Sequence, residues 1–202
     1  MTGILLSTGN KAAPVSERGV DLYQTPSEAV KMLLSVEDIP EAVWEPACGP
    51  GAITRVLEAA GHQVYSSDLY NYNWGHDADL DFLKTVRMPH LESGEVIDCI
   101  ITNPPYMNRS PERFARHAVE LGPAKVCMLL RIGFLTSQRR QDIVNNSGLF
   151  RVYGFSRRLP MMHRDGWAGK RAGSAIDFAW FVWRRDYSDR PHFISVDWKD
   201  YV

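Results

Sequence analysis

The chain lacks several features that would narrow its class. Its 202 residues contain three cysteines, Cys48, Cys99 and Cys127, and no C-x-x-C pair. This odd count argues against a disulfide framework, and Cys99 and Cys127 stand in apolar runs typical of a core. No apolar stretch approaches the roughly 18 residues of a transmembrane helix, and no signal peptide is evident. We therefore expect a cytoplasmic protein that binds no membrane, and we predict no metal site.

The glycine pattern excludes a common phosphate site. The segment "EPACGPG" (45–51) places Gly49 and Gly51 in a tight turn between a predicted strand and a predicted helix. It lacks the full G-x-G-x-x-G spacing, and no Lys-Ser/Thr pair follows, so it is not a P-loop. A turn this sparse in glycine disfavours NAD, which needs a place for its pyrophosphate. The acidic Glu45 at the end of the strand instead suits a cationic or amine-bearing ligand.

The overall composition is that of a globular protein with a substantial core. It is 45% hydrophobic and 23% charged, without internal repeats or low-complexity tracts, and its length fits one domain. Residues 1–20 are polar and contain glycine, which predicts a flexible arm. We therefore expect a single domain over residues 21–202, with no separate target-recognition domain.

The net charge of −1 hides an asymmetry between the two halves of the chain. Residues 1–106 hold 6 Lys+Arg and 15 Asp+Glu, a balance of −9, whereas residues 107–202 hold 17 and 9, a balance of +8. One interpretation is a solvated surface whose charges happen to segregate. The other is a basic face for a polyanion beside an acidic half with a different task.

Apolar runs alternate with helical patterns along the chain. Strands are expected at 42–46, 62–68, 96–103, 124–130, 149–155 and 176–183, and helices at 25–34, 52–61, 111–121 and 136–144. In the first helix, Thr25 and Glu28 predict a capping box, and Pro26 fits the first helical position. The alternation predicts βαβ units and a mostly parallel sheet. The last two strands have no helix between them, which predicts an antiparallel hairpin at one edge.

Polar residues at the ends of the predicted strands indicate where a ligand binds, because such sheets bind ligands outside the carboxyl ends of their strands. Asp68 lies 17 residues beyond Gly51, close to the offset at which an acid binds ribose hydroxyls. Further on, Asp81 and Phe82 are placed to hydrogen-bond and flank an adenine ring, although neighbouring acids compete for that role. Ribose, adenine and an amine-bearing end together describe S-adenosylmethionine.

The segment "NPPY" (103–106) ends the predicted strand at 96–103. Prolines cannot donate to the ladder, so strand pairing stops there and backbone carbonyls are left free. Asn103 adds a side-chain carbonyl, and two acceptors together suit a planar amino group. Tyr106 offers a ring face, and stacking on it would contribute about 1–3 kcal/mol to an extruded base.

These motifs make the chain similar to the DNA adenine-N6 methyltransferases, a family of S-adenosylmethionine-dependent enzymes. The resemblance covers about residues 21–185 and rests on "YQTP" (23–26), "EPACGPG" and "NPPY". It implies a Rossmann-like methyltransferase fold with a mostly parallel seven-stranded sheet, an antiparallel edge hairpin and helices on both faces. Small stand-alone forms of this family occur on phages and mobile elements.

The resemblance also implies site residues. Those that would surround S-adenosylmethionine, or the product S-adenosylhomocysteine, are Tyr23, Thr25, Pro26, Glu45, Pro46, Gly49, Gly51, Asp68, Asp81 and Phe82. Those that would hold the flipped adenine for catalysis are Asn103, Pro104, Pro105 and Tyr106. The amine would attack the sulfonium methyl in line, with no metal and no covalent nucleophile.

A basic segment, "SRRLPMMHRDGWAGKRAG" (156–173), joins the last two predicted strands and holds Trp167 among its cations. Cations interleaved with an aromatic ring suit phosphate contact and base stacking, so the segment is a candidate surface for single- or double-stranded DNA. The candidate phosphate-binding residues here and in "TSQRRQD" (136–142) are Arg139, Arg140, Arg157, Arg158, Arg164, Lys170 and Arg171. A solvated hairpin loop is the alternative.

Other functions remain open at this stage. Without a target-recognition domain, specificity is short or relaxed, or a dimer or a second subunit supplies it. The same motifs suit methyltransferases that act on RNA amines or on protein glutamine amides, although the latter usually carry a helical domain before the glycine turn. A non-catalytic nucleic-acid-binding subunit of a methyltransferase complex is the third alternative.

Overall fold

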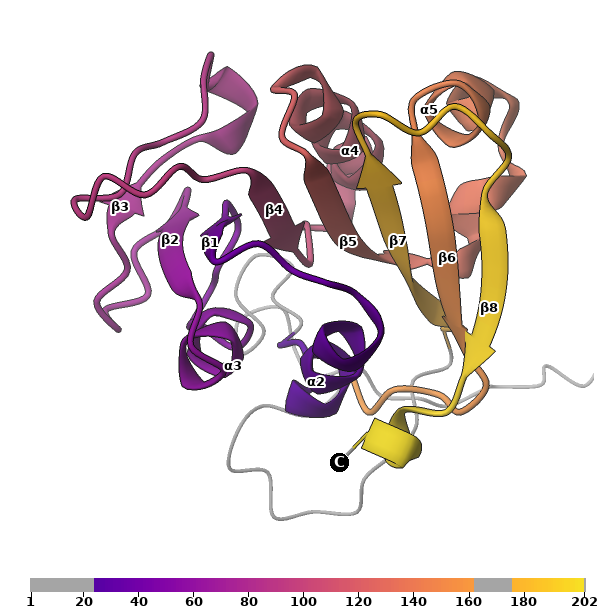
Figure 1. Ribbon diagram of the computed structural model, residues 1–202, viewed down its shortest axis with the longest axis horizontal. Helices are drawn as coiled ribbons and strands as arrows, with labels where there is room; N and C mark the ends of the chain where they lie inside the picture. Colours follow the sequence, from indigo (N-terminus) through magenta and orange to yellow (C-terminus); the bar gives the residue numbers. More distant parts are fainter. Residues whose placement is uncertain (1–23, 162–175, 202) are drawn as a thin grey trace, which may run out of the picture.

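A computed structural model describes residues 24–161 and 176–201, which build a mixed sheet with helices on both of its faces (Figure 1). The predicted arm at 1–20 and most of the basic segment at 156–173 lie outside these residues. The strands are β1 (Ala42–Glu45), β2 (Gln63–Asp68), β3 (Ala78–Asp79), β4 (Cys99–Thr102), β5 (Lys125–Arg131), β6 (Leu149–Phe155), β7 (Phe178–Arg184) and β8 (His192–Val196).

The α-helices are α2 (Ser27–Val36), α3 (Thr54–Ala59), α4 (Ser110–Glu120) and α5 (Gln141–Asn145). Short 3₁₀ segments complete the described part: η1 (Phe82–Lys84), η2 (Met107–Arg109), η3 (Ile132–Thr136), η4 (Gln138–Arg140) and η5 (Trp198–Tyr201). None of the helices in these residues has the length and apolar character that crossing a membrane requires.

The sheet differs from the predicted one in strand number and direction. The described residues form eight strands in the order β3-β2-β1-β4-β5-β7-β6-β8, so the predicted seven-stranded, mostly parallel sheet is wrong. β1 to β5 pair in parallel, whereas β7 runs antiparallel to both β5 and β6. β6 and β7 are the expected antiparallel pair, but they do not form the edge, because β8 pairs in parallel with the outer side of β6.

Two apolar clusters hold the layers together, one on each face of the sheet. α2 and α3 contribute Met32, Leu33 and Leu57 to the first cluster. α4 and α5 contribute Phe114 and Ile143 to the second. The helices therefore cover opposite faces, as Figure 1 shows.

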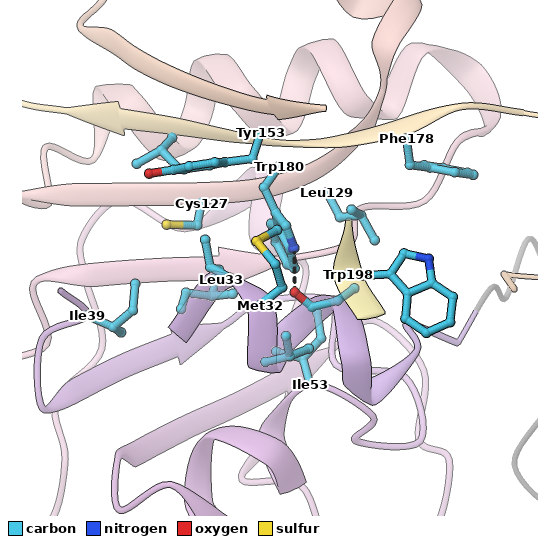
Figure 2. Packing of buried hydrophobic residues seen from close by; sticks show 14 of the residues in the cluster. Met32, Leu33, Ile39, Ile53, Cys127, Leu129, Tyr153, Phe178, Trp180 and Trp198 are labelled. Atoms are coloured by element: carbon cyan, nitrogen blue, oxygen red, sulfur yellow. Dashed lines mark hydrogen bonds between the residues drawn. The ribbon is translucent and has the colours of Figure 1, made fainter. Parts of the chain in front are cut away.

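Burial confirms the predicted core positions of Cys99 and Cys127, and two tryptophans of β7 are buried with them. Cys99, Cys127 and Trp180 are 0% exposed, and Trp183 is 1% exposed. The indole Nε1 of Trp180 donates a hydrogen bond of 2.8 Å to the Ala29 carbonyl, which ties β7 to α2 (Figure 2).

The predicted start of the first helix is wrong in detail. α2 begins at Ser27 with Pro26 in the N-cap position, and no side chain caps it there. The Thr25 hydroxyl instead accepts a hydrogen bond from the Asn103 side chain. Thr25 therefore lies one residue before the N-cap position, so it is not the capping residue that the sequence predicts.

The helix predicted at 136–144 is divided into η4 and α5. The Arg140 side chain donates to the Gly133 and Phe134 carbonyls, which holds this segment against η3.

Candidate active site

A cavity of about 330 Å³ lies at the carboxyl ends of β1, β2 and β4. Parallel strands bring their ends to one edge of a sheet, so residues distant in sequence meet here. The predicted site residues that line it are Thr25, Glu45, Pro46, Gly49, Asp68, Asp81, Phe82, Asn103, Pro104, Pro105 and Tyr106. Pro26 and Gly51 are not among the lining residues, and Tyr23 lies outside the described part of the chain.

The glycine turn is fixed from two sides. Gly49 and Gly51 have φ values of +52° and +79°, in the left-handed region that favours glycine. The carboxylate of Asp68 accepts a hydrogen bond of 2.9 Å from the Gly49 amide, which joins the turn to the end of β2.

The bare backbone of Gly51 accommodates an indole ring. A Cβ atom at Gly51 would lie 2.6 Å from the ring of Trp74, whose Nε1 donates to the Gly49 carbonyl. The guanidinium of Arg55 lies 5.5 Å from the centre of the same ring. Gly51 is therefore needed for packing against Trp74, which explains why it does not line the cavity.

Glu45 is a buried acid at the floor of the cavity. Its side chain is 1% exposed, and Oε2 accepts hydrogen bonds from the amide and the hydroxyl of Thr54 at the start of α3. Burial raises the pKa of Glu45 to about 8, against the opposing effect of the Thr54 hydrogen bonds. Burial likewise raises the pKa of Asp68. Two carboxyl groups that are costly to ionise favour a positively charged ligand between them.

Asp68 retains hydrogen-bonding capacity beyond its structural contacts. One oxygen accepts from Gly49 and the other accepts a 2.9 Å hydrogen bond from the Tyr70 amide. Each carboxylate oxygen carries two lone pairs, so two acceptor positions remain for hydroxyl groups. This arrangement is compatible with the ribose-binding role predicted for Asp68.

Asp81 and Phe82 take part in local structure as well as lining the cavity. The Asp81 carboxylate accepts from the Leu83 amide and forms an ion pair of 3.1 Å with Lys84. Phe82 is only 2% exposed and packs edge-on against Trp44. The structure leaves Phe82 little surface on which to flank an adenine ring.

Asn103 joins the two sides of the cavity. Its Nδ2 donates a hydrogen bond of 3.1 Å to the Thr25 hydroxyl, which is itself 6% exposed. Its Oδ1 lies 2.8 Å from the Tyr106 hydroxyl, which also lies 2.7 Å from the Leu129 carbonyl. A tyrosine hydroxyl carries one proton and donates to one of these oxygens at a time. The Tyr106 hydroxyl therefore links Asn103 to the carbonyl of Leu129 on β5.

The ring of Tyr106 has neighbours on one face and at its edge. The guanidinium of Arg131 lies 4.9 Å from the ring centre, and Phe178 packs in a T-shaped contact at 5.7 Å. The stacking role of Tyr106 stays a prediction.

The arginines predicted to bind phosphate have partners in the protein. Arg157 forms a bidentate pair with Asp197, Arg158 pairs with Asp177, and Arg139 pairs with Glu112. Arg140 donates to two backbone carbonyls and lies over the Phe134 ring. None of these four lines the cavity, and Arg164, Lys170 and Arg171 lie outside the described residues.

Several residues at the cavity were not predicted from the sequence, and they lie in the loop after β2, in η2 and in α4. Tyr70, Tyr72, Met107 and Arg113 line it, and Trp74 packs behind it. The segment "YNYNWG" (70–75), which alternates aromatic and asparagine residues directly after Asp68, was a signal that could have been used. Within the described part of the chain, no three His, Cys, Asp or Glu side chains gather as a metal-binding group.

No protein-family model and no curated protein matches the chain. Solved structures do match its fold. The modification subunit assigned to a type I restriction enzyme of Vibrio vulnificus has a TM-score of 0.60 and 12% identity, over 90% of this chain and 48% of its own length. This chain therefore spans about half of that subunit.

Two further structures extend the comparison to other methyltransferases. A protein assigned to the class I S-adenosylmethionine-dependent methyltransferases of Listeria monocytogenes has a TM-score of 0.59 and 11% identity, over 90% of this chain and 68% of its own. A protein assigned as an RNA methyltransferase of Pyrococcus horikoshii has a TM-score of 0.57 and 14% identity, over 82% of this chain and 87% of its own length. Identities this low establish the architecture and not the substrate. The chain has the fold of S-adenosylmethionine-dependent methyltransferases.

Proposed function

We propose that the chain transfers a methyl group from S-adenosylmethionine to the exocyclic amine of adenine in DNA. The observation that carries this proposal is one cavity that joins an acidic floor to the "NPPY" segment, with Asn103 hydrogen-bonded across it to Thr25. A methyl donor and an amine must meet in such a place, because transfer needs the two groups aligned and in contact.

The floor of the cavity suits the donor. The buried Glu45 and Asp68 favour a cationic ligand, and Asp68 has acceptor capacity for ribose hydroxyls. Thr25 and Gly49 complete the same wall, and Phe82 contributes an apolar edge. The donor supplies an activated methyl group on sulfur, and these residues bind and orient it.

The "NPPY" segment suits the acceptor. Asn103 Oδ1 and the Pro104 carbonyl would accept the two hydrogens of the adenine amine and leave its lone pair directed at the methyl carbon. The new N–C bond forms as the C–S bond breaks, and the amine then loses one proton to water. Tyr106 would stack on the base, which offsets part of the few kcal/mol that flipping costs.

Asn103→Ala tests the proposal. We expect loss of methyl transfer by about 10²-fold or more, the scale for removing one hydrogen-bonding group from a reacting centre. Calorimetry should show S-adenosylmethionine binding retained, and transfer of a tritiated methyl group to adenine-containing oligonucleotides measures the rate. Asn145→Ala, at an exposed asparagine in α5, is the matched control. Wild-type transfer by the Asn103 variant, or no binding by the wild type, would overturn the proposal.

A second candidate substrate is RNA, since the Pyrococcus horikoshii neighbour is assigned as an RNA methyltransferase. The site would bind an NH2 group, which the glutamine side chain also carries, so methyl transfer to protein glutamine is the further alternative. Long-read modification mapping of DNA and RNA from cells that express the chain separates these cases and reports sequence context. Unmodified nucleic acids with a methylated protein fraction would favour glutamine.

We also propose that recognition of the target involves a dimer or a partner subunit. The Vibrio vulnificus neighbour is described as a subunit and is about twice as long as the matched region. Light scattering of the purified chain, alone and with DNA, tests self-association. A non-catalytic role for the chain is disfavoured because Asn103 and Tyr106 both line the cavity.

A further inference from the structure

Three exposed arginines surround the "NPPY" side of the cavity. Arg113 lines the cavity itself, and Arg131 lies over the ring of Tyr106. Arg109 stands between Asn108 and Ser110, two lining residues. All three belong to elements that meet at one edge of the sheet: the turn before α4, the first turns of α4, and the end of β5.

These arginines have no carboxylate partner among the residues described by the structure. The acid beside Arg113 in sequence, Glu112, lies 3.5 Å from Arg116 and 3.4 Å from Arg139. Asp142 on α5 also pairs with Arg116. The local acids are therefore already engaged by other cations.

This arrangement is the reverse of that around the arginines first predicted to bind DNA. Arg157, Arg158 and Arg139 each have an acidic partner at 2.9–3.4 Å. A phosphate would have to displace that partner, whereas at Arg109, Arg113 and Arg131 it displaces no carboxylate among the described residues. Exposed ion pairs are weak, but their exchange still removes part of the gain from phosphate binding.

The backbone beside these arginines is held in an unusual conformation. Asn108 and Arg109 have φ values of +52° and +61°, two consecutive left-handed residues that are not glycine. Such conformations cost of order 1–3 kcal/mol each and persist where the surroundings impose them. Here they turn the chain from "NPPY" into α4 and keep Asn108 and Ser110 at the cavity.

We propose that Arg109, Arg113 and Arg131 bind the phosphates on either side of the flipped nucleotide and so position the target strand. This inference rests on the proposed function, because it assigns the strand contacts of the same site. Phosphate contacts fix register and carry no sequence information. The chain thus positions any strand at its cavity by charge, and sequence preference comes from elsewhere.

The test measures the salt dependence of binding. Fluorescence anisotropy follows a labelled, adenine-containing single strand and its duplex over a series of salt concentrations. Loss of one phosphate contact lowers the slope of log K against log salt by about 0.7 for a single strand and 0.9 for a duplex. We expect this change for each of Arg109→Gln, Arg113→Gln and Arg131→Gln, with S-adenosylmethionine binding unchanged by calorimetry.

Matched variants separate the inference from its alternatives. Arg157→Gln and Arg158→Gln remove the same charge from paired arginines and should leave the slope unchanged. Arg131→Lys loses the planar contact with Tyr106 but keeps the charge. Because the charge is kept, the slope of log K against log salt should return to the wild-type value that Arg131→Gln lowers. If the control variants lower the slope and the three cavity variants do not, the inference fails while the proposed function stands. If the wild type transfers no methyl group to any nucleic acid, the proposed function itself fails.

Discussion

Two buried glutamates at opposite ends of the sheet show how partners decide the behaviour of one residue type. Glu37 is 7% exposed and Glu45 is 1% exposed. Glu37 contacts Lys125, the first residue of β5, whereas Glu45 is the last residue of β1. Because β1 and β5 run in the same direction, the first residue of β5 and the last residue of β1 lie at opposite ends of the strands.

Their hydrogen-bonding partners differ in charge. Glu37 accepts from Lys125 at 2.8 Å, from Arg151 at 3.1 Å and from the Tyr153 hydroxyl at 2.7 Å. Burial pushes the pKa of Glu37 upward, but these hydrogen bonds outweigh it and leave the pKa below its ordinary value. Glu45 has the neutral Thr54 instead, and burial raises its pKa to about 8. At one end of the sheet the buried carboxylate has its own counter-charges, and at the other end the buried carboxyl group is held protonated near neutral pH.

The largest expected effect comes from breaking the paired end. Glu37→Gln leaves Lys125, whose side chain is 11% exposed, without its charge partner. Removing one partner of a buried pair costs about 3 kcal/mol or more in the free energy of unfolding. Urea denaturation measures this cost as a lower midpoint at unchanged slope. The double variant Glu37→Gln/Lys125→Met should recover part of the lost free energy of unfolding. A cost below about 1 kcal/mol for Glu37→Gln alone would contradict a stabilising role for the charged partners of Glu37.

The next effect concerns the unpaired end and its dependence on pH. Between pH 4.5 and about 8, folded Glu45 holds a proton that the unfolded chain has released, so stability falls as pH rises through this window. At pH 7 the cost is about 3 kcal/mol, from 1.36 kcal/mol per pH unit. Glu45→Gln cannot ionise, so its free energy of unfolding should not show this decline. Urea titrations at several pH values from about 5 to 8.5 compare the two proteins.

Glu37 provides the control of opposite sign for that experiment. Because the folded pKa of Glu37 is lowered, its contribution is complete above pH 4.5 and is lost as the pH falls through the folded value. Glu37→Gln should therefore keep the decline between pH 4.5 and 8 that Glu45→Gln removes. If the free energy of unfolding of Glu45→Gln still falls between pH 4.5 and 8, a group other than Glu45 causes the fall.

The smallest effect distinguishes two glycines on either side of α3. Gly51 and Gly61 both have positive φ, +79° and +96°, but an added Cβ meets Trp74 at Gly51 and nothing within 4 Å at Gly61. Alanine at Gly61 should cost only the conformational strain, about 1–2 kcal/mol. Alanine at Gly51 should cost more, and it should also weaken S-adenosylmethionine binding in calorimetry. Equal costs and equal binding would show that Trp74 adjusts freely.

The sequence was sufficient for the elements whose apolar runs are long. β6, predicted at 149–155, has those bounds, and β5 and β7 differ by one or two residues at their ends. β3 has two residues, and β8 is mostly exposed, so neither has a run that stands out from a loop. The place of β8 outside β6 depends on long-range pairing, which local patterns do not encode.

The candidate site was predictable to the extent that it follows strand ends. Glu45, Asp68 and Asn103 meet because parallel strands end at one edge. The contacts of Trp74 with Gly51 and of Arg131 with Tyr106 depend on loop geometry, which no spacing reveals. The ion pair of Arg157 with Asp197 joins residues 40 positions apart, so the sequence could not show that Arg157 has an acidic partner.

The hydrogen bond between Trp180 and α2 has a consequence for the order in which the chain assembles during synthesis. Thr25, which bonds Asn103, directly precedes α2, yet α2 packs against Trp180 and Trp198 near the other end of the chain (Figure 2). On a ribosome, residues 24–114 emerge long before these two indoles. The pocket should therefore remain unassembled until Trp180 and Trp198 have emerged, and we expect nascent chains truncated before Trp180 not to bind S-adenosylmethionine.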